Sequence, residues 1–150
     1  KSQFGLEVFR IQTFIDYLSE RDDIDDSRIA MWGNSMGGAS TLFTVPIERR
    51  IDVAICSSFF NDRLTKHVKT EPRYSHFRPM SEAAHFFIPG WFREFSDADL
   101  TSLICPRPFM VQAGIADDID WRPYLRDEFD RASKHYEKLG IGERIELLDH

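Results

Sequence analysis

This sequence is poor in cysteine, in long apolar runs and in clustered positive charge. Its 2 cysteines among 150 residues are too few for a disulfide scaffold. No apolar run approaches the roughly 18 residues that a membrane-spanning helix needs. No block of lysine and arginine offsets the formal net charge of −6, which argues against nucleic acid as the main partner. The sequence therefore argues against disulfide-rich, membrane-spanning and nucleic-acid-binding proteins.

The first residues lack the usual signals of a protein's beginning. Residues 1–4 include no initiator Met and no signal-peptide pattern. They lead at once into helical periodicity, so we expect a chain cut from a longer one, and the compartment and oligomeric state stay open.

The 42% hydrophobic and 13% aromatic content is enough for the core of one domain.

Apolar periodicity and turn residues predict helices that alternate with strands. Helices are expected over residues 4–18, from 38 onward, and over 97–103 and 123–139, and strands over 28–32, 51–57, 109–112 and 144–148. In the last helix the apolar stripe ends before Gly140, the expected stop, and Ser96 is the expected cap of the helix that follows it. Such alternation is typical of an α/β protein with a parallel sheet.

Residues 59–95 interrupt this alternation. The stretch has no clear periodicity, contains several prolines and is rich in large aromatic rings, which favours a cap-like excursion over a structureless loop. Its early part is locally basic, with Arg63, Lys66, Lys69, Arg73 and Arg78 against Asp62 and Glu71. We considered an anion-binding role for this segment, but a solvated charged face is the more common origin of such a run.

The chain is organised around Gly33-Asn34-Ser35-Met36-Gly37. A short apolar strand precedes this Gly-x-Ser-x-Gly motif and a helix follows it, which is the context of the nucleophile elbow in α/β-hydrolases. The sharp turn exposes the serine hydroxyl above the sheet. Gly33 and Gly37 are expected to flank Ser35 because a Cβ at either position would crowd the backbone. The Met36 N–H, at the helix N-terminus, is the expected oxyanion donor.

An activated serine needs a base and an acid that orients the base. In this fold the three follow the chain order Ser, acid, His. Asp117 is the predicted acid because it lies three residues after Gly114, in the turn that leaves the third strand. Asp118 is the next candidate, and a surface carboxylate is the alternative for either residue.

Several stretches resemble the acetyl xylan esterase and dienelactone hydrolase-like branch of the α/β-hydrolases. They are residues 28–38, 88–90, 105–109, 114–117 and 136–147. The resemblance implies a Ser35 nucleophile, an Asp117 acid, a Met36 oxyanion donor and a histidine in a turn after the last strand. Matched position by position, that histidine falls beyond the end of this chain. His150 would serve as the base only if the loop were unusually short.

The remaining histidines and the cysteines favour structural interpretations. His67, His76 and His85 recur every nine residues, which would place successive ones on opposite faces of a helix, and no carboxylate completes a metal-ligand spacing. We therefore expect no metal, and His135 is expected on a solvated helix face. Cys56 and Cys105 are expected at opposite ends of neighbouring strands, so two buried free thiols are predicted.

The sequence thus predicts an α/β-hydrolase fold, with a parallel sheet, helices on both faces, and only the carboxyl-terminal half present. Residues 1–150 form one partial domain in this interpretation. The predicted function is a cofactor-free serine hydrolase that cleaves a small-molecule carboxylic ester through an acyl-enzyme on Ser35. A serine peptidase of the prolyl oligopeptidase type and a catalytically inactive binding module are the alternatives. We expect the 150-residue chain by itself to be inactive.

Overall fold

The computed structural model describes residues 2–68, 88, 90–116 and 122–149. Its elements, in chain order, are α1 (Gln3–Ser19), β1 (Ile29–Asn34), α2 (Met36–Thr44), β2 (Ile51–Ser57), α3 (Arg63–Val68), α4 (Trp91–Glu94), α5 (Asp97–Ile104), β3 (Phe109–Ala113), α6 (Arg122–Lys138), the 3-10 helix η2 (Gly142–Arg144) and β4 (Ile145–Asp149). None of the described helices is long and apolar enough to cross a membrane.

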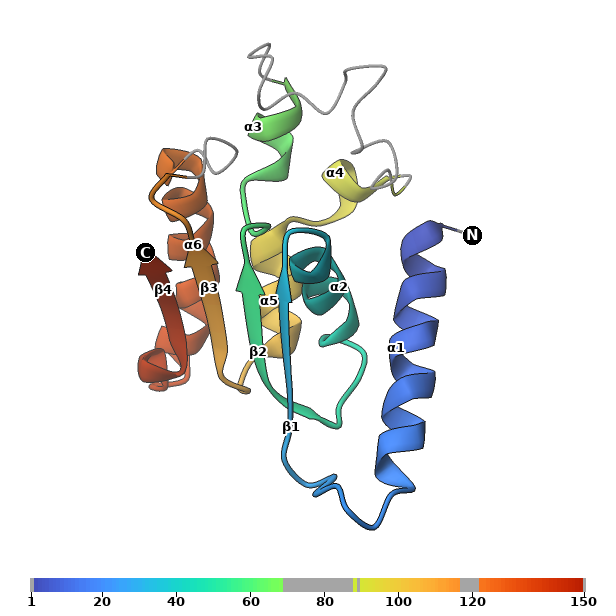
Figure 1. Ribbon diagram of the computed structural model, residues 1–150. Helices are drawn as coiled ribbons and strands as arrows, with labels where there is room; N and C mark the ends of the chain where they lie inside the picture. The colour runs from blue at the N-terminus through green and yellow to red at the C-terminus, as the bar shows by residue number, and fades with distance from the viewer. Residues whose placement is uncertain (1, 69–87, 89, 117–121, 150) are drawn as a thin grey trace.

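The four described strands form one parallel sheet in the order β1-β2-β3-β4 (Figure 1). Asn34 pairs with Ser57, and Ser57 pairs with Gln112, so the carboxyl ends of the first three strands lie at the same edge of the sheet. The predicted parallel α/β architecture is therefore confirmed. This edge matters for function because such sheets bind ligands outside the carboxyl ends of their strands.

The helices α2, α5 and α6 lie on one side of the sheet (Figure 1). The strand side chains that face them, including Ala54, Cys56 and Val111, are fully buried. We expected helices on both faces, but within the described residues the other face carries none. Its side chains include Trp32, which is 65% exposed. The core of the described chain thus lies between one sheet face and one helical layer.

The helices α1, α2, α5 and α6 form close to their predicted positions. Ser2 caps α1 by accepting the Gly5 N–H at 3.1 Å, and Ser96 caps α5 in a reciprocal capping box with Asp99. α6 buries Leu125, Ala132 and Tyr136 of its predicted stripe and ends at Lys138, two residues before Gly140, which adopts a positive φ of 69°. A glycine tolerates this conformation without steric cost, so the predicted stop is confirmed.

The segment between β2 and β3 contains two short helices that sequence periodicity did not reveal. α3 has 6 residues and α4 has 4, and so few turns leave almost no periodic pattern to detect. α3 lies beyond the carboxyl end of β2 (Figure 1). Residues 69–87 fall outside the described part, so a cap-like role for residues 59–95 stays a prediction.

Both cysteines are free, as the sequence predicted. Cys56 is buried in β2, and its thiol donates to the Gly38 carbonyl at 3.4 Å. Cys105 is only partly buried, so the expectation of two buried thiols was wrong for this residue. Cys105 lies at the end of α5, just before the strand, where less of the core covers it.

Candidate active site

Ser35 lies at a sharp turn between a strand and a helix. β1 ends at Asn34 and α2 begins at Met36, so one residue makes the whole connection. Its backbone has φ 54° and ψ −113°, a conformation that L residues rarely adopt and that costs energy. The Ser35 N–H donates to the Ser57 carbonyl at 2.9 Å. This bond fixes the exposed serine at the carboxyl edge of the sheet, as the nucleophile elbow motif predicts.

The glycines around Ser35 differ in what their missing side chains allow. A Cβ on Gly33 would lie 2.0 Å from the Gly37 carbonyl oxygen, so the strand and helix approach too closely for any side chain. A Cβ on Gly37 would meet nothing within 4 Å, and the expectation that it is needed for space was wrong. Gly38 is the second crowded position, because a Cβ there would lie 2.6 Å from the Ser57 carbonyl oxygen.

The N-terminus of α2 faces the region above Ser35 and carries no side-chain cap. The first N–H groups of a helix have no partner within the helix, and the helix dipole adds partial positive charge there. Met36 is the first residue of α2, and its side chain is 53% exposed. This geometry suits a developing oxyanion, although the donor role of Met36 stays a prediction.

A second strained serine lies beside the elbow. Ser58 has φ 52°, and it follows Ser57 just as Ser35 follows the paired residue Asn34. The Ser58 N–H donates to the Gln112 carbonyl at 2.9 Å. Two adjacent strands are therefore each followed directly by a serine with a positive φ. Ser58 could not be singled out from the sequence, because no glycine motif surrounds it.

A buried ion pair lies behind the turn that follows β2. The Arg63 Nε and the Asp97 Oδ2 are 3.0 Å apart, and the side chains are only 3% and 0% exposed. Burial is the main cause that raises the pKa of Asp97 to about 6, against the opposing effect of Arg63. Arg63 is thus neither solvated nor part of an open basic surface, and Lys66 is also buried. The described part of the basic segment does not form the solvated face we favoured.

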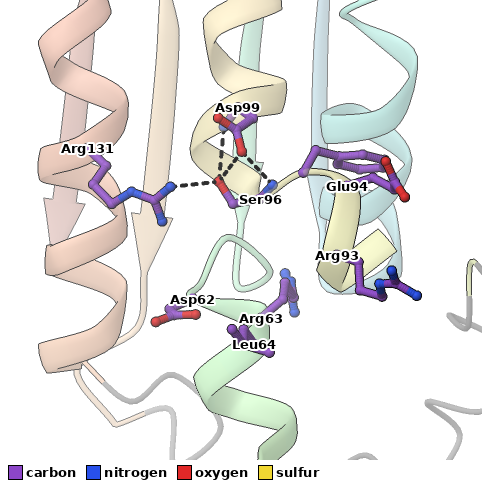
Figure 2. A pocket seen from close by; sticks show the side chains of 9 residues that line it. Asp62, Arg63, Leu64, Arg93, Glu94, Ser96, Asp99 and Arg131 are labelled. Atoms are coloured by element: carbon purple, nitrogen blue, oxygen red, sulfur yellow. Dashed lines mark hydrogen bonds between the residues drawn. The ribbon is translucent and has the colours of Figure 1, made fainter. Parts of the chain in front are cut away.

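A cavity of about 290 Å³ opens near the N-terminus of α5. Figure 2 shows Arg131 reaching toward Ser96, which also bonds Asp99. The residues that line the cavity are Asp62, Arg63, Leu64, Arg93, Glu94, Phe95, Ser96, Asp99 and Arg131. Three arginines are balanced by three carboxylates, and the lining includes neither Ser35 nor Met36. This cavity is therefore separate from the elbow.

The other predicted triad members lie outside the described residues, namely Asp117, Asp118 and His150. At the carboxyl end of β4, Asp149 forms an ion pair with Arg126 of α6. His135 is exposed on α6 as expected, while His76 and His85 fall in the part that the structure does not describe. Among the described residues no three potential ligands gather as a metal site would require.

The amino-acid sequence matches a model of a known protein family. The family model of the prolyl oligopeptidase family matches residues 8–120. A Bacillus subtilis (strain 168) protein named "Putative hydrolase YtaP" is 29% identical over 119 residues, which are 78% of this chain and 37% of that protein. The chain therefore spans about a third of the length of this curated relative.

Solved structures share the fold at low sequence identity. One, described as "a putative acetyl xylan esterase" from Bacteroides fragilis NCTC 9343, matches with a TM-score of 0.75 and 16% identity over 98% of this chain and 36% of its own. A glucuronoyl esterase from Caldicellulosiruptor kristjansonii matches with a TM-score of 0.69 and 19% identity, over 95% and 43%. These matches confirm the α/β-hydrolase fold.

Proposed function

Because this chain belongs to the prolyl oligopeptidase family and has an α/β-hydrolase fold, we propose that it carries the nucleophile of a serine hydrolase. The proposed substrate is a small-molecule carboxylic ester. The observation that supports this most directly is the conformation of Ser35, a strained and exposed serine between β1 and α2. A protein retains such strain where the surrounding structure enforces it, and these places are often functional.

In the proposed reaction the Ser35 hydroxyl attacks the ester carbonyl carbon. A histidine outside the described residues accepts the hydroxyl proton, and Asp117 orients that histidine. The carbonyl oxygen becomes an oxyanion that the Met36 N–H stabilises, together with a second donor. The tetrahedral intermediate collapses, the alcohol leaves with the proton, and water then hydrolyses the acyl-enzyme.

A peptidase is the second candidate, because the matching family model is that of the prolyl oligopeptidases. Both reactions use the same nucleophile and differ in the leaving group, an alcohol or an amine. The similar solved structures described as esterases favour the ester. An inactive binding module is the third candidate, and it would retain the elbow without turnover.

The test uses the full-length protein. A fluorophosphonate should label Ser35, and Ser35→Ala should reduce turnover of p-nitrophenyl acetate by several orders of magnitude. Ser133→Ala is the matched control, since the Ser133 hydroxyl donates to the Phe129 carbonyl within α6, and this substitution should leave turnover unchanged. A Ser35→Ala variant that keeps most of its activity would refute the assignment.

The same preparation separates the candidate functions. Faster Ser35-dependent cleavage of a peptide p-nitroanilide than of any ester tested would favour the peptidase. Absence of both turnover and fluorophosphonate labelling would favour the binding module.

A further inference from the structure

The turn that follows β2 is pressed against the nucleophile elbow. The Ser57 carbonyl accepts the Ser35 N–H at 2.9 Å. A Cβ on Gly38 would lie 2.6 Å from the same carbonyl and 2.9 Å from the Cβ of Phe59. Because no space separates these segments, the position of residues 57–59 determines where Ser35 can lie.

This turn contains the strained Ser58 and therefore depends on its surroundings. A left-handed serine costs on the order of 1–3 kcal/mol and persists only where other contacts hold it. On one side the Ser58 N–H is held by the Gln112 carbonyl of β3. On the other side the chain enters the core at once, with Phe60 fully buried and Asn61 1% exposed.

Arg63 and Asp97 bind this second side. The Arg63 guanidinium donates to the Phe59 carbonyl, and its Cζ lies 3.6 Å from the centroid of the Phe59 ring. Asp97 Oδ2 accepts both the Arg63 Nε–H and the Asn61 N–H, each at 3.0 Å. Two side chains thus hold the backbone of the turn at two separate points.

Asp97 is itself anchored to the helical layer. It is the first residue of α5, and the next N–H, that of Ala98, donates to Glu128 Oε1 of α6 at 2.7 Å. Arg131 pairs with the other Glu128 oxygen at 2.7 Å. The turn beside Ser35 is therefore connected to α5 and, through it, to α6.

A purely stabilising role explains this ion pair poorly. Desolvation of two buried charges can outweigh their attraction, and apolar replacement of such pairs is often neutral. Burial raises the pKa of Asp97 to about 6, so the charged carboxylate is less favoured at this position than it would be in water. Its Oδ1 has no hydrogen-bond partner among the described residues. An ion pair whose burial costs free energy, and which contacts the turn at two points, is better explained by a role in positioning that turn.

We propose that Arg63 and Asp97 are positioning residues of the hydrolase, which hold the turn at residues 57–61 against the elbow and thereby orient Ser35. This inference rests on the proposed function of Ser35. It adds that the competence of the nucleophile depends on a buried ion pair contributed by α3 and α5.

The test replaces the pair without leaving a single buried charge. In the double variant Arg63→Met/Asp97→Asn, the asparagine oxygen can still accept the Asn61 N–H, while the bonds from the guanidinium are lost. The control is Arg50→Met/Glu48→Gln, a more exposed arginine–carboxylate pair with a 2.8 Å contact, which lies just before β2 and does not touch residues 57–61. Both are made in the full-length protein and checked for folding by near-ultraviolet circular dichroism.

Three measurements follow. With p-nitrophenyl acetate, kcat of the Arg63/Asp97 variant should fall about tenfold to a hundredfold, as expected for a misplaced reacting group, with a much smaller change in KM. Fluorophosphonate labelling of Ser35 should slow in parallel. Amide hydrogen exchange of residues 57–61 should accelerate by about tenfold. The Arg50/Glu48 control should change none of these.

A folded Arg63/Asp97 variant with wild-type kcat and wild-type exchange at residues 57–61 overturns the inference. If the double variant does not fold, Arg63→Lys replaces it, since lysine keeps the charge but cannot bond Asp97 and Phe59 with one rigid fork; unchanged kcat and exchange there also overturn the inference. Failure of the proposed function looks different. Turnover would then survive Ser35→Ala, whereas the exchange measurement still decides whether Arg63 and Asp97 hold the turn.

Discussion

At the scale of single residues, the elbow is shaped by a lack of space around two glycines. Gly33 faces the Gly37 carbonyl and Gly38 faces the Ser57 carbonyl, both of which are backbone atoms that cannot rotate away. Gly37, which the motif singles out, has open space where a Cβ would lie. The motif therefore identifies Gly33 correctly, but it includes Gly37, where space is open, and does not include Gly38, which the packing requires.

Alanine substitutions should separate these two positions. Gly38→Ala should lower the free energy of unfolding by about 1–3 kcal/mol or more, because the new methyl group overlaps the Ser57 carbonyl. Gly37→Ala should leave it unchanged or raise it by up to about 1 kcal/mol, since alanine favours the helix. Urea denaturation of both variants measures the difference. Equal stability of the two variants would contradict the crowding at Gly38.

The predicted acid is also a question of single residues. Asp117→Asn should lower kcat by about 10⁴, the loss that the corresponding change causes in a Ser-His-Asp protease. Asp118→Asn should have little effect, because the neighbouring side chain is expected to point away from the site. Steady-state kinetics on p-nitrophenyl acetate provides the comparison. The opposite pattern would move the acid to Asp118.

At the scale of elements, a charged network joins α1 to the start of β2. Arg50 contacts Glu48 at 2.8 Å and Asp16 of α1 at 2.7 Å. The hydrogen bond from Arg50 is the main cause that lowers the pKa of Glu48 to about 2. A carboxyl whose pKa is lower in the folded state stabilises the fold above its unfolded pKa. That stabilisation is lost as the pH falls through the folded pKa.

Glu48 should therefore contribute to acid stability within a defined window. Its contribution, on the order of 3 kcal/mol, should be complete above about pH 4.5 and should disappear as the pH falls toward 2. Glu48→Gln should remove this part of the pH dependence. Chemical denaturation between pH 2 and 7 measures it, and Glu143→Gln, whose side chain is 72% exposed, is the control. Parallel curves for wild type and Glu48→Gln would contradict the assignment.

At the scale of the whole molecule, the described sheet has one face without helices and two edge strands, β1 and β4. β1 is an edge strand in the described order, and the face that carries Trp32 has no helix over it (Figure 1). Val53 and Leu148, on the same face, are 37% and 38% exposed. Apolar surface next to an unpaired edge is an aggregation hazard.

The 150-residue chain by itself should therefore bind a hydrophobic dye and associate in solution. Trp32→Gln should reduce dye fluorescence, because it removes the largest side chain of the open face. Leu103→Gln is the control, since Leu103 is comparably exposed at 62% but lies on α5. Size-exclusion chromatography and dye titration measure the effect. A monomeric chain that binds no dye would contradict this prediction.

The sequence by itself determined the features that have local causes. These features include the apolar stripe of α6, the Ser96 cap and the Gly140 stop. Each depends on residues within a few positions of one another, so each can be predicted from the sequence. The elbow is local too, because a strand, Ser35 and a helix follow without a gap. The same locality explains why alternating elements predicted a parallel sheet.

Tertiary structure alone decided the contacts between distant segments. Arg63 and Asp97 are 34 positions apart, and nothing in a basic run indicates that one arginine is buried against a later aspartate. The need for glycine at position 38 and the strain at Ser58 likewise arise from the neighbouring strands, β2 and β3. Such features follow from which strands become neighbours and in what register. Strand order and register depend on how much apolar surface the whole core buries. This sum cannot be obtained from any short stretch of the sequence.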